Sequence, residues 1–321
     1  MKKKSEIIEP KNQVHLYGYK FFFNAFIKLF DEGKLPNSLL LSGQKGIGKS
    51  TFAYHFINNL FSKNEKFQYS VNDFFINSEN SSFKLVNSNT HPNFFLIDNL
   101  NTDNEIKIDK VRSLLKFLNK TTYNKNLKIV LIDDAEHLNI NSSNALLKAI
   151  EEPPKNTYFL IINNSASTLS KTLKSRCVEF KIFLSKEEKK VITKNILNQY
   201  QIDINSNNLI SNLYFDTPGN LTKLYLTLKS ESFDISTDKL SCIVFLIDKY
   251  SNEKNPEVLN FITLLINLFY NEISMSSNEN ISSYFLNQSR IIKKINEMRK
   301  FNLNEKNVLF WVKDILLNEK K

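Results

Sequence analysis

One short stretch of the chain, Gly43-Gln44-Lys45-Gly46-Ile47-Gly48-Lys49-Ser50, fits the phosphate-binding pattern G-x-x-x-x-G-K-[ST]. Glycines in such a loop let backbone N–H groups approach phosphate oxygens closely, and the start of a following helix adds a favourable dipole. We expect Lys49 to reach the β- and γ-phosphates and the hydroxyl of Ser50 to bind Mg²⁺. Together with Thr51, this loop predicts a binding site for a nucleoside triphosphate.

Acids and amides follow two later apolar runs. Asp133 ends the run at 128–133 and Asp134 comes next. The first acid can hold the Mg²⁺ shell and the second can orient the attacking water, although Asp reaches less far than Glu and predicts poor water activation. Asn163 ends the following run, and it or Asn164 is expected to contact the γ-phosphate or the water. A plain turn is the alternative interpretation of these two amides.

The elements that must position these residues alternate along the chain. Apolar runs predict buried strands at 39–41, 94–98, 128–133 and 158–163. One-sided apolar spacing predicts helices at 19–30, after the phosphate loop, at 108–119 and at 141–152. Such alternation implies an α/β domain whose parallel sheet is covered on both faces. The stretch 62–90, rich in Asn, Ser and Lys, predicts an irregular insertion.

The pattern becomes almost entirely helical after residue 183. Ser185 to Glu188 form a capping-box sequence that predicts a helix start. The apolar stretch 258–270 predicts a core helix, too short to cross a bilayer. A last helix is expected to carry an apolar stripe made of Val308, Trp311, Val312, Ile315 and Leu316. We therefore expect three domains, at 1–182, 183–245 and 246–321.

The composition indicates which partners, metal sites and cellular location are expected for the protein. Lys and Arg outnumber Asp and Glu by 43 to 33, a formal charge of +10 that favours polyanions such as nucleic acid, or else reflects a general Lys bias. Cys177 and Cys242 are far apart, which excludes a thiolate zinc site and a disulfide framework. The lysines at 2–4 are not followed by an apolar signal segment. A cytoplasmic protein without a membrane segment is expected.

Several of these segments together resemble the bacterial clamp-loader AAA+ family, and within it the delta prime subunits of DNA polymerase III. The matching text includes the phosphate loop, the helix NALLKAIEEPP that begins at Asn144, and the tripeptide Ser175-Arg176-Cys177. The resemblance covers roughly residues 14–182 and implies a P-loop AAA+ domain followed by a small helical lid and an all-α collar. It also implies ATP and Mg²⁺ as cofactors and a place in a DNA polymerase holoenzyme.

The resemblance also implies roles for single residues. Gly43 to Thr51 would be Walker A, Asp133 the Walker B acid, and Asn163 or Asn164 sensor 1. Arg176 would be an arginine finger that enters the ATP site of a neighbouring subunit. The implied partners are gamma/tau and delta subunits and, through the complex, the sliding clamp and primer-template DNA.

Three departures from the family pattern bear on activity. No four-cysteine zinc module follows the loop, Asp134 replaces a Glu, and Thr222 stands where motor subunits tend to carry Arg. We therefore expect ATP binding with weak or absent hydrolysis, as for a stator that acts through its arginine finger. Two alternatives stay open: a gamma/tau-type motor ATPase of the same assembly, and a P-loop kinase acting on a small molecule.

Overall fold

The computed structural model describes residues 7–99, 105–120, 127–164, 169–202, 216–234, 238–276, 281–301 and 303–319. The chain divides into two compact units. Among the described residues, the first, here called the sheet unit, comprises those within 7–195 and 217–220; the second, the helical unit, comprises those within 196–216 and 221–319. The division near 195 differs from the boundary expected at 182/183, because the first part of the following helix belongs to the sheet unit.

The sheet unit is built on five strands in the order β2-β3-β4-β1-β5, with every neighbouring pair parallel. Their bounds are β1 Ser38–Gly43, β2 Phe94–Ile97, β3 Lys128–Ile132, β4 Thr157–Asn164 and β5 Val178–Lys181. The central strands are buried at nearly every position, which explains why their sequences are continuous apolar runs. Strand β5 was not predicted, because it is a half-exposed edge strand without such a run.

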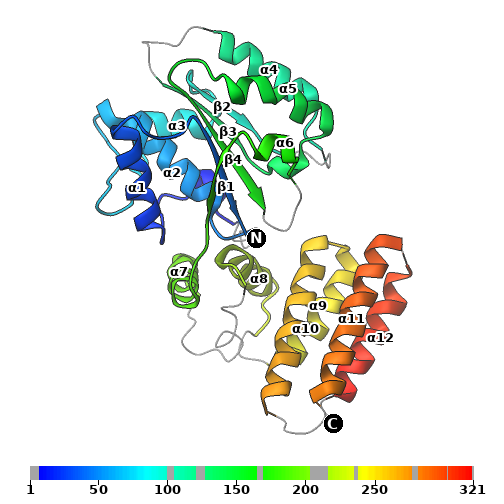
Figure 1. Cartoon of the computed structure of the whole chain (residues 1–321). Helices are drawn as coiled ribbons and strands as arrows, with labels where there is room; N and C mark the ends of the chain where they lie inside the picture. Colours follow the sequence, from blue (N-terminus) through cyan, green and yellow to red (C-terminus); the bar gives the residue numbers. More distant parts are fainter. Residues whose placement is uncertain are drawn as a thin grey trace. The chain divides into compact units, whose positions relative to one another are not determined.

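Helices cover both faces of this sheet (Figure 1). Three lie on one face: α1 (Lys20–Asp31), α2 (Lys49–Phe61) and α3 (Ser81–Asn87). Three lie on the other: α4 (Ile108–Asn119), α5 (Ile140–Glu151) and α6 (Lys171–Lys174). Apolar side chains of α4 and α5 pack against β3 and β4 in one core. The expected α/β domain with a parallel sheet is confirmed.

The insertion at 62–90 is more ordered than its composition predicted. It contains a 3₁₀ turn, Ser62–Asn64, and the helix α3. The Glu65 carboxylate accepts hydrogen bonds from the backbone N–H groups of Ser81 at 3.0 Å and Ser82 at 3.1 Å. A carboxylate at that end satisfies N–H groups that a helix leaves unpaired and also complements the helix dipole. The prediction of an irregular segment was therefore wrong for α3.

Among the described residues, the helical unit contains the end of α7 (Lys186–Gln199), most of α8 (Pro218–Ser230), and four further helices. These are α9 (Lys239–Glu253), α10 (Pro256–Ser276), α11 (Ile281–Phe301) and α12 (Glu305–Asn318). The capping box that opens α7 is confirmed: the Glu188 N–H donates to Ser185 Oγ at 3.2 Å, and the Ser185 N–H donates to Glu188 Oε2 at 2.8 Å. Helix α9 continues through 245 and 246, so the boundary expected there falls inside a helix.

Helix α10 is longer than the apolar stretch suggested. By length and composition alone, Pro256–Met275 could cross a membrane, with a mean hydropathy of 1.3 over its most apolar window. Half of that window is buried within the protein, and Ile262, Leu265 and Ile266 are fully enclosed by the core of the helical unit. The core-helix interpretation is confirmed. In α12, Val308, Val312 and Leu316 are buried, but Trp311 is 37% exposed and does not belong to that buried stripe.

Candidate nucleotide site and arginine motif

The phosphate loop lies between β1 and α2, as its sequence pattern requires. Gly46 has φ +80° and Gly48 has φ +103°, values that L side chains rarely adopt. A Cβ on Gly46 would also approach Thr217 Oγ1 to 2.6 Å, so only glycine fits there. Gly48 is the N-cap of α2, so that the loop ends at a helix N-terminus suited to an anion.

Lys49 is the centre of the polar network in this loop. Its Nζ donates to the carbonyl oxygens of Gly43 at 3.0 Å and Gln44 at 2.8 Å, and to Oδ1 of Asn164 at 3.0 Å. Burial lowers the pKa of Lys49 to about 8, opposed by the negative charge of nearby Asp133. The lysine is therefore held at the loop by carbonyl oxygens and by an acidic environment.

Asp133 and Asp134 follow β3 and point to different partners. Asp133 is hydrogen-bonded to Ser50, and burial raises its pKa to about 6, helped by the charge of Asp134. Ser50 and Asp133 thus bring a hydroxyl and a carboxylate together, the oxygen ligands that Mg²⁺ prefers. Asp134 adopts a left-handed conformation, φ +54°, and its Oδ1 accepts from Asn164 Nδ2 at 3.3 Å.

Of the two amides at the end of β4, Asn164 is the one that meets the loop. Its Nδ2 also contacts Glu136 Oε1, and its backbone N–H donates to Glu136 Oε2 at 3.3 Å. Asn163 is buried, and its Oδ1 has no hydrogen-bond partner among the residues that the structure describes. Of the two amides left open by the sequence, Asn164 is therefore the one that contacts Lys49 and the acids after β3. Glu136 is a further residue of this network that no sequence signal indicated.

The start of α8 packs on the phosphate loop inside the sheet unit. The Gly219 N–H donates to the Gly46 carbonyl at 2.9 Å, and Thr217 Oγ1 donates to the Lys45 carbonyl at 2.9 Å. A Cβ on Gly219 would come within 2.7 Å of the Gly46 carbonyl oxygen. Thr222, which stands where motor subunits tend to carry Arg, is buried in α8.

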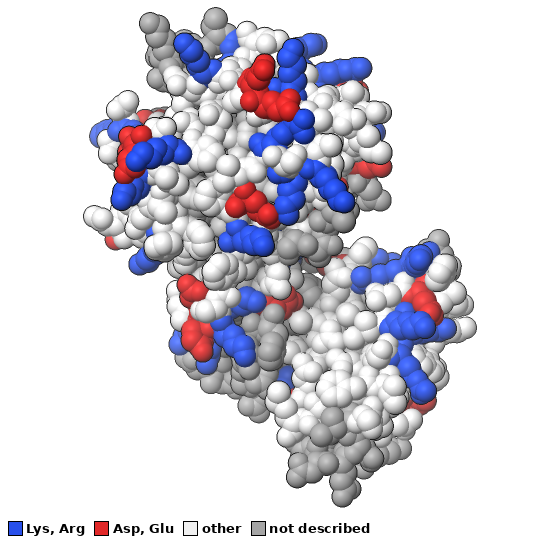
Figure 2. All heavy atoms as spheres, in the orientation of Figure 1, with Lys and Arg blue, Asp and Glu red and all other residues white. Residues whose placement is uncertain are grey.

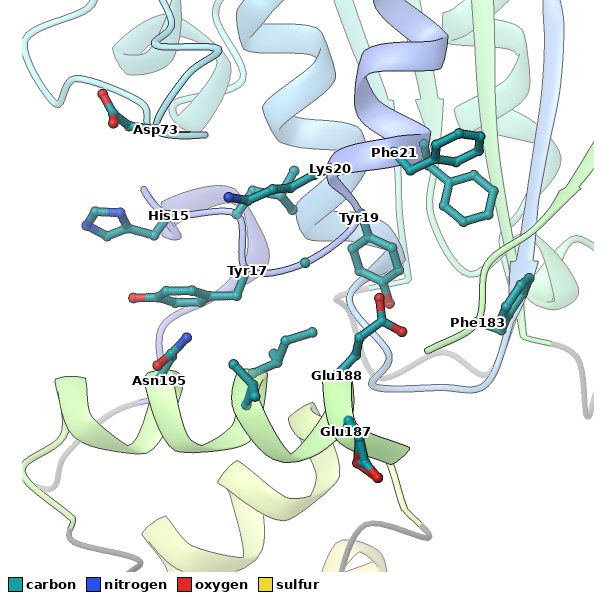
Figure 3. Close-up of a pocket in the computed structure, with 15 residues that line it drawn as sticks. His15, Tyr17, Tyr19, Lys20, Phe21, Asp73, Phe183, Glu187, Glu188 and Asn195 are labelled. Carbon is teal, nitrogen blue, oxygen red and sulfur yellow. The ribbon is translucent and has the colours of Figure 1, made fainter. Parts of the chain in front are cut away.

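A pocket of about 740 Å³ lies beside the loop (Figure 3). Its walls include Tyr17, Gly18 and Tyr19 from the segment before α1, and Glu188 and Asn195 from α7. Tyr19 links the pocket to the loop, because its ring lines the pocket while its hydroxyl donates to the Ile47 carbonyl. This pocket was not predicted from the sequence.

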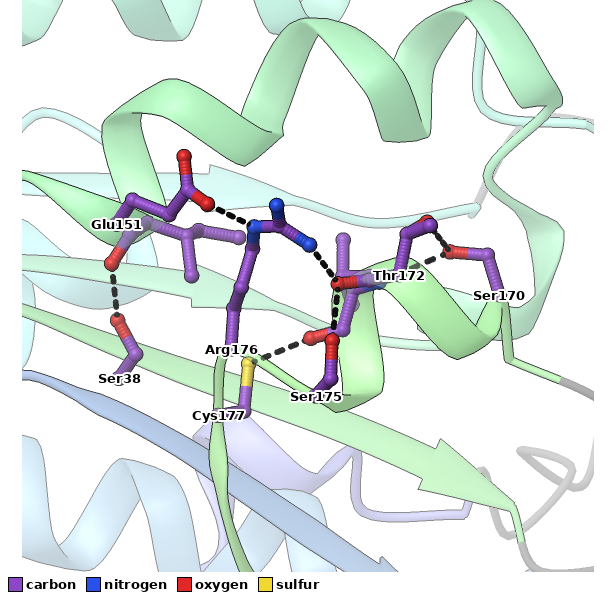
Figure 4. A network of polar contacts seen from close by, with 9 residues as sticks. Ser38, Glu151, Ser170, Thr172, Ser175, Arg176 and Cys177 are labelled. Carbon is purple, nitrogen blue, oxygen red and sulfur yellow. Dashed lines mark hydrogen bonds and ion pairs between the residues drawn. The ribbon is translucent and has the colours of Figure 1, made fainter.

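Arg176 lies between α6 and β5 (Figure 4), and none of its hydrogen bonds among the described residues reaches the phosphate loop. Its Nε contacts Glu151 Oε1, and its Nη1 donates to the Thr172 carbonyl at 2.8 Å. Ser175 Oγ donates to the same carbonyl at 3.0 Å, and Cys177 Sγ donates to the Leu173 carbonyl at 3.3 Å. All three side chains of the Ser-Arg-Cys motif thus donate hydrogen bonds to carbonyls at the end of α6.

Basic side chains gather over the part of the sheet unit where α5 and α6 lie (Figure 2). The exposed lysines of these two helices are Lys148 in α5 and Lys171 and Lys174 in α6. Lys174 is paired with Glu179 at 3.1 Å. A surface of this charge suits a polyanionic partner.

Comparisons with known proteins identify the family to which this chain is similar. A family model described as "DNA polymerase III, delta subunit" matches residues 18–186. The DNA polymerase III subunit delta' of Pseudomonas aeruginosa is 34% identical over 143 residues, covering 44% of this chain and 42% of that protein. Subunit gamma of Buchnera aphidicola subsp. Schizaphis graminum is 28% identical, covering 56% of this chain and 47% of that protein. The chain spans about half the length of the curated relatives it matches.

A longer match is to subunit delta' of Buchnera aphidicola subsp. Baizongia pistaciae, 26% identical over 70% of this chain and 65% of that protein. Among solved structures, a DNA polymerase III gamma subunit-related protein from Thermotoga maritima has a TM-score of 0.49 and 18% identity, covering 93% of this chain and 99% of its own.

Proposed function

The chain belongs to the family described as DNA polymerase III, delta subunit, and we propose that it is the delta prime subunit of a clamp loader that acts in DNA replication. The observation that carries the proposal is the position of Arg176. It is held at the end of α6 by Glu151 and Thr172, and none of its contacts among the described residues involves its own phosphate loop. Such an arginine is available to the nucleotide site of a neighbouring subunit.

The site fits ATP and Mg²⁺ through its own side chains. Lys49 and the loop N–H groups would bind phosphate oxygens, and Ser50 with Asp133 would hold the ion. Mg²⁺ in such a site neutralises charge on the β- and γ-phosphates. The pocket lined by Tyr19 would hold the base, because the Tyr19 hydroxyl also binds the Ile47 carbonyl of the phosphate loop and the pocket offers aromatic faces from Tyr17 and Tyr19.

Hydrolysis by this subunit is proposed to be weak. Asp134, the residue placed to orient water, is short and accepts a hydrogen bond from Asn164. A carboxylate engaged in that way is a poor base for an attacking water, which must lie within hydrogen-bond reach. The main contribution to ATP turnover would then be made in trans by Arg176. A guanidinium at a γ-phosphate stabilises transition-state charge and is worth about 10³–10⁵ in rate in GTPases.

A gamma/tau-type motor subunit is the second candidate. The intact phosphate loop and the similarity to gamma subunits favour it. The Asp at 134 and the Thr at 222 favour the delta prime assignment instead. In either case the proposed partners are the other loader subunits (gamma/tau and delta) in the cytoplasm, with the sliding clamp and primer-template DNA reached through the complex.

Reconstitution tests the proposal. The other loader subunits of the same organism are assembled with and without this chain, and loading of the sliding clamp onto primed DNA is measured. The proposal predicts that the chain enters the complex in fixed stoichiometry and that loading depends on it. A chain that fails to assemble, or a loader equally active without it, would contradict the assignment.

A further inference from the structure

We propose that Glu151 is a positioning residue for Arg176: its carboxylate holds the guanidinium so that the opposite end faces a neighbouring subunit's nucleotide. This inference rests on the trans-acting role proposed above for Arg176. It adds a role for the first Glu of the NALLKAIEEPP segment, which contacts no part of its own phosphate loop among the described residues.

The contacts of Arg176 leave one end of its guanidinium free (Figure 4). Nε contacts Glu151, and Nη1 donates to the Thr172 carbonyl at 2.8 Å. In the part of the chain that the structure describes, Nη2 has no hydrogen-bond partner. Because the group is planar and rigid, fixing Nε and one hydrogen of Nη1 also fixes the direction of the free end. The free end carries the remaining N–H of Nη1 and an N–H of Nη2 side by side, a pair of donors that suits two oxygens of a phosphate.

Both supports of Arg176 are anchored in the sheet unit. Thr172 lies in α6, and the strand after Arg176 pairs with β1 through Val178 and Leu39. Glu151 is the last residue of α5, and the preceding residue, Ile150, accepts a hydrogen bond from Ser38 of β1 at 3.1 Å. The carboxylate and the guanidinium are therefore presented from elements fastened to the same strand.

Exposure of the pair fits an interaction with a partner. The Arg176 side chain is 31% exposed and that of Glu151 is 45% exposed, so the pair lies at the surface of the sheet unit, where a partner can reach it. A partly exposed ion pair of this kind contributes little to stability. Its effect is to restrict the rotamers of a long side chain, and ordering the guanidinium beforehand lowers the entropy lost in the transition state.

The test is a pair of substitutions in the reconstituted loader. Glu151→Gln removes the charge and Glu151→Asp shortens the reach, and both should lower kcat of the DNA-stimulated ATPase about 3- to 10-fold with KM for ATP unchanged. Glu152→Gln is the matched control, because this neighbouring exposed carboxylate forms no hydrogen bond or ion pair among the described residues, whereas Glu151 is paired with Arg176. Thermal unfolding of each variant subunit should match that of the unmodified chain.

A double variant shows whether Glu151 acts through Arg176. In the Arg176→Ala background, Glu151→Gln should have no further effect on kcat. An unchanged or raised kcat for Glu151→Gln, or full additivity of the two substitutions in the double variant, would overturn the positioning role of Glu151. The trans-acting role of Arg176 would still stand in that case, provided that Arg176→Ala is defective. If Arg176→Ala alone left kcat unchanged, the proposed function itself would fail.

Discussion

Nζ of Lys49 donates a 3.0 Å hydrogen bond to Oδ1 of Asn164, although the two residues are 115 positions apart. The parallel register of β1 and β4 explains the contact, because it pairs Gly43, the first residue of the phosphate loop, with Asn164. On its other side the Asn164 amide donates to Asp134 at 3.3 Å. One amide therefore joins the lysine of the loop to the acids that follow β3.

Removal of the loop lysine should abolish nucleotide binding. Lys49→Ala deletes the ammonium that Gly43 and Gln44 hold in the loop, and with it the main charge available to the β- and γ-phosphates. Fluorescence of a labelled nucleotide should saturate with the unmodified chain and Mg²⁺ but not with the variant. Equal saturation by both proteins would show that the loop does not bind the phosphates.

The two neighbouring asparagines should behave differently. Asn164→Ala removes the hydrogen bond to Lys49 and the links to Asp134 and Glu136, and should weaken Mg·ATP binding about tenfold. Asn163→Ala is the control, since Oδ1 of that side chain has no partner among the described residues. Titration with labelled nucleotide distinguishes them; a larger loss for Asn163→Ala would contradict the assignment of the sensor to Asn164.

Intrinsic hydrolysis should be slow. The isolated chain is expected to turn over ATP well below about 1 s⁻¹, the lower end of typical enzyme rates, because Asp134 is short and engaged with Asn164. Asp134→Glu should raise the rate, since the added methylene extends the carboxylate toward a water. Steady-state phosphate release measures both proteins. Brisk turnover by the unmodified chain would favour the motor-subunit alternative.

Stability should fall in mild acid because of His55. Its ring lies between the Gln13 carbonyl at 2.9 Å and the Tyr69 hydroxyl at 3.0 Å, and burial lowers its pKa from 6.5 to about 3. Between pH 6.5 and pH 3 the His55 imidazole is therefore protonated in the unfolded chain but neutral in the folded protein. The contribution of neutral His55 to the free energy of unfolding is complete above pH 6.5 and is lost as the pH falls toward 3. Within this range the free energy of unfolding should fall by up to about 1.4 kcal/mol per pH unit.

Denaturant unfolding at several pH values measures this effect. His55→Gln should be less stable at pH 7 but should show a shallower fall in unfolding free energy below pH 6.5. Because His91 also has a pKa lowered by burial, to about 4, some pH dependence should remain in the variant. An unchanged slope in His55→Gln would show that His55 does not titrate with unfolding.

Strong local patterns were enough to predict much of the fold. The helix at 108–119 has the expected bounds, and the bounds of the central strands agree with the prediction within a residue or two. Long apolar runs and one-sided apolar spacing can be recognised within the segment itself, without knowledge of distant residues. Helix α3 was missed because it is short and is stabilised by Glu65, a residue outside the helix. Strand β5 was missed because its residues form no apolar run, and only their pairing with β1 makes them a strand.

Long-range contacts explain what the sequence could not predict about the site. Asn163 and Asn164 are adjacent in a strand, so they point to opposite faces, and only pairing with β1 decides which one reaches the loop. Glu136 contacts Asn164 because Asp134 adopts a left-handed turn that redirects the chain after β3. The glycine pattern alone located the loop, whereas the contact of Gly219 with Gly46 needs the fold.

The central claim, that Arg176 acts on a neighbour's nucleotide, is tested most directly by DNA-stimulated ATPase of the loader assembled with Arg176→Ala. Arg176→Lys should be defective as well, because an ammonium lacks the planar fork. We predict a large loss of hydrolysis and clamp loading, while assembly and this subunit's own nucleotide binding stay nearly unchanged. Full activity of the Arg176→Ala loader would contradict the account and leave the Ser-Arg-Cys motif a purely structural cap of α6.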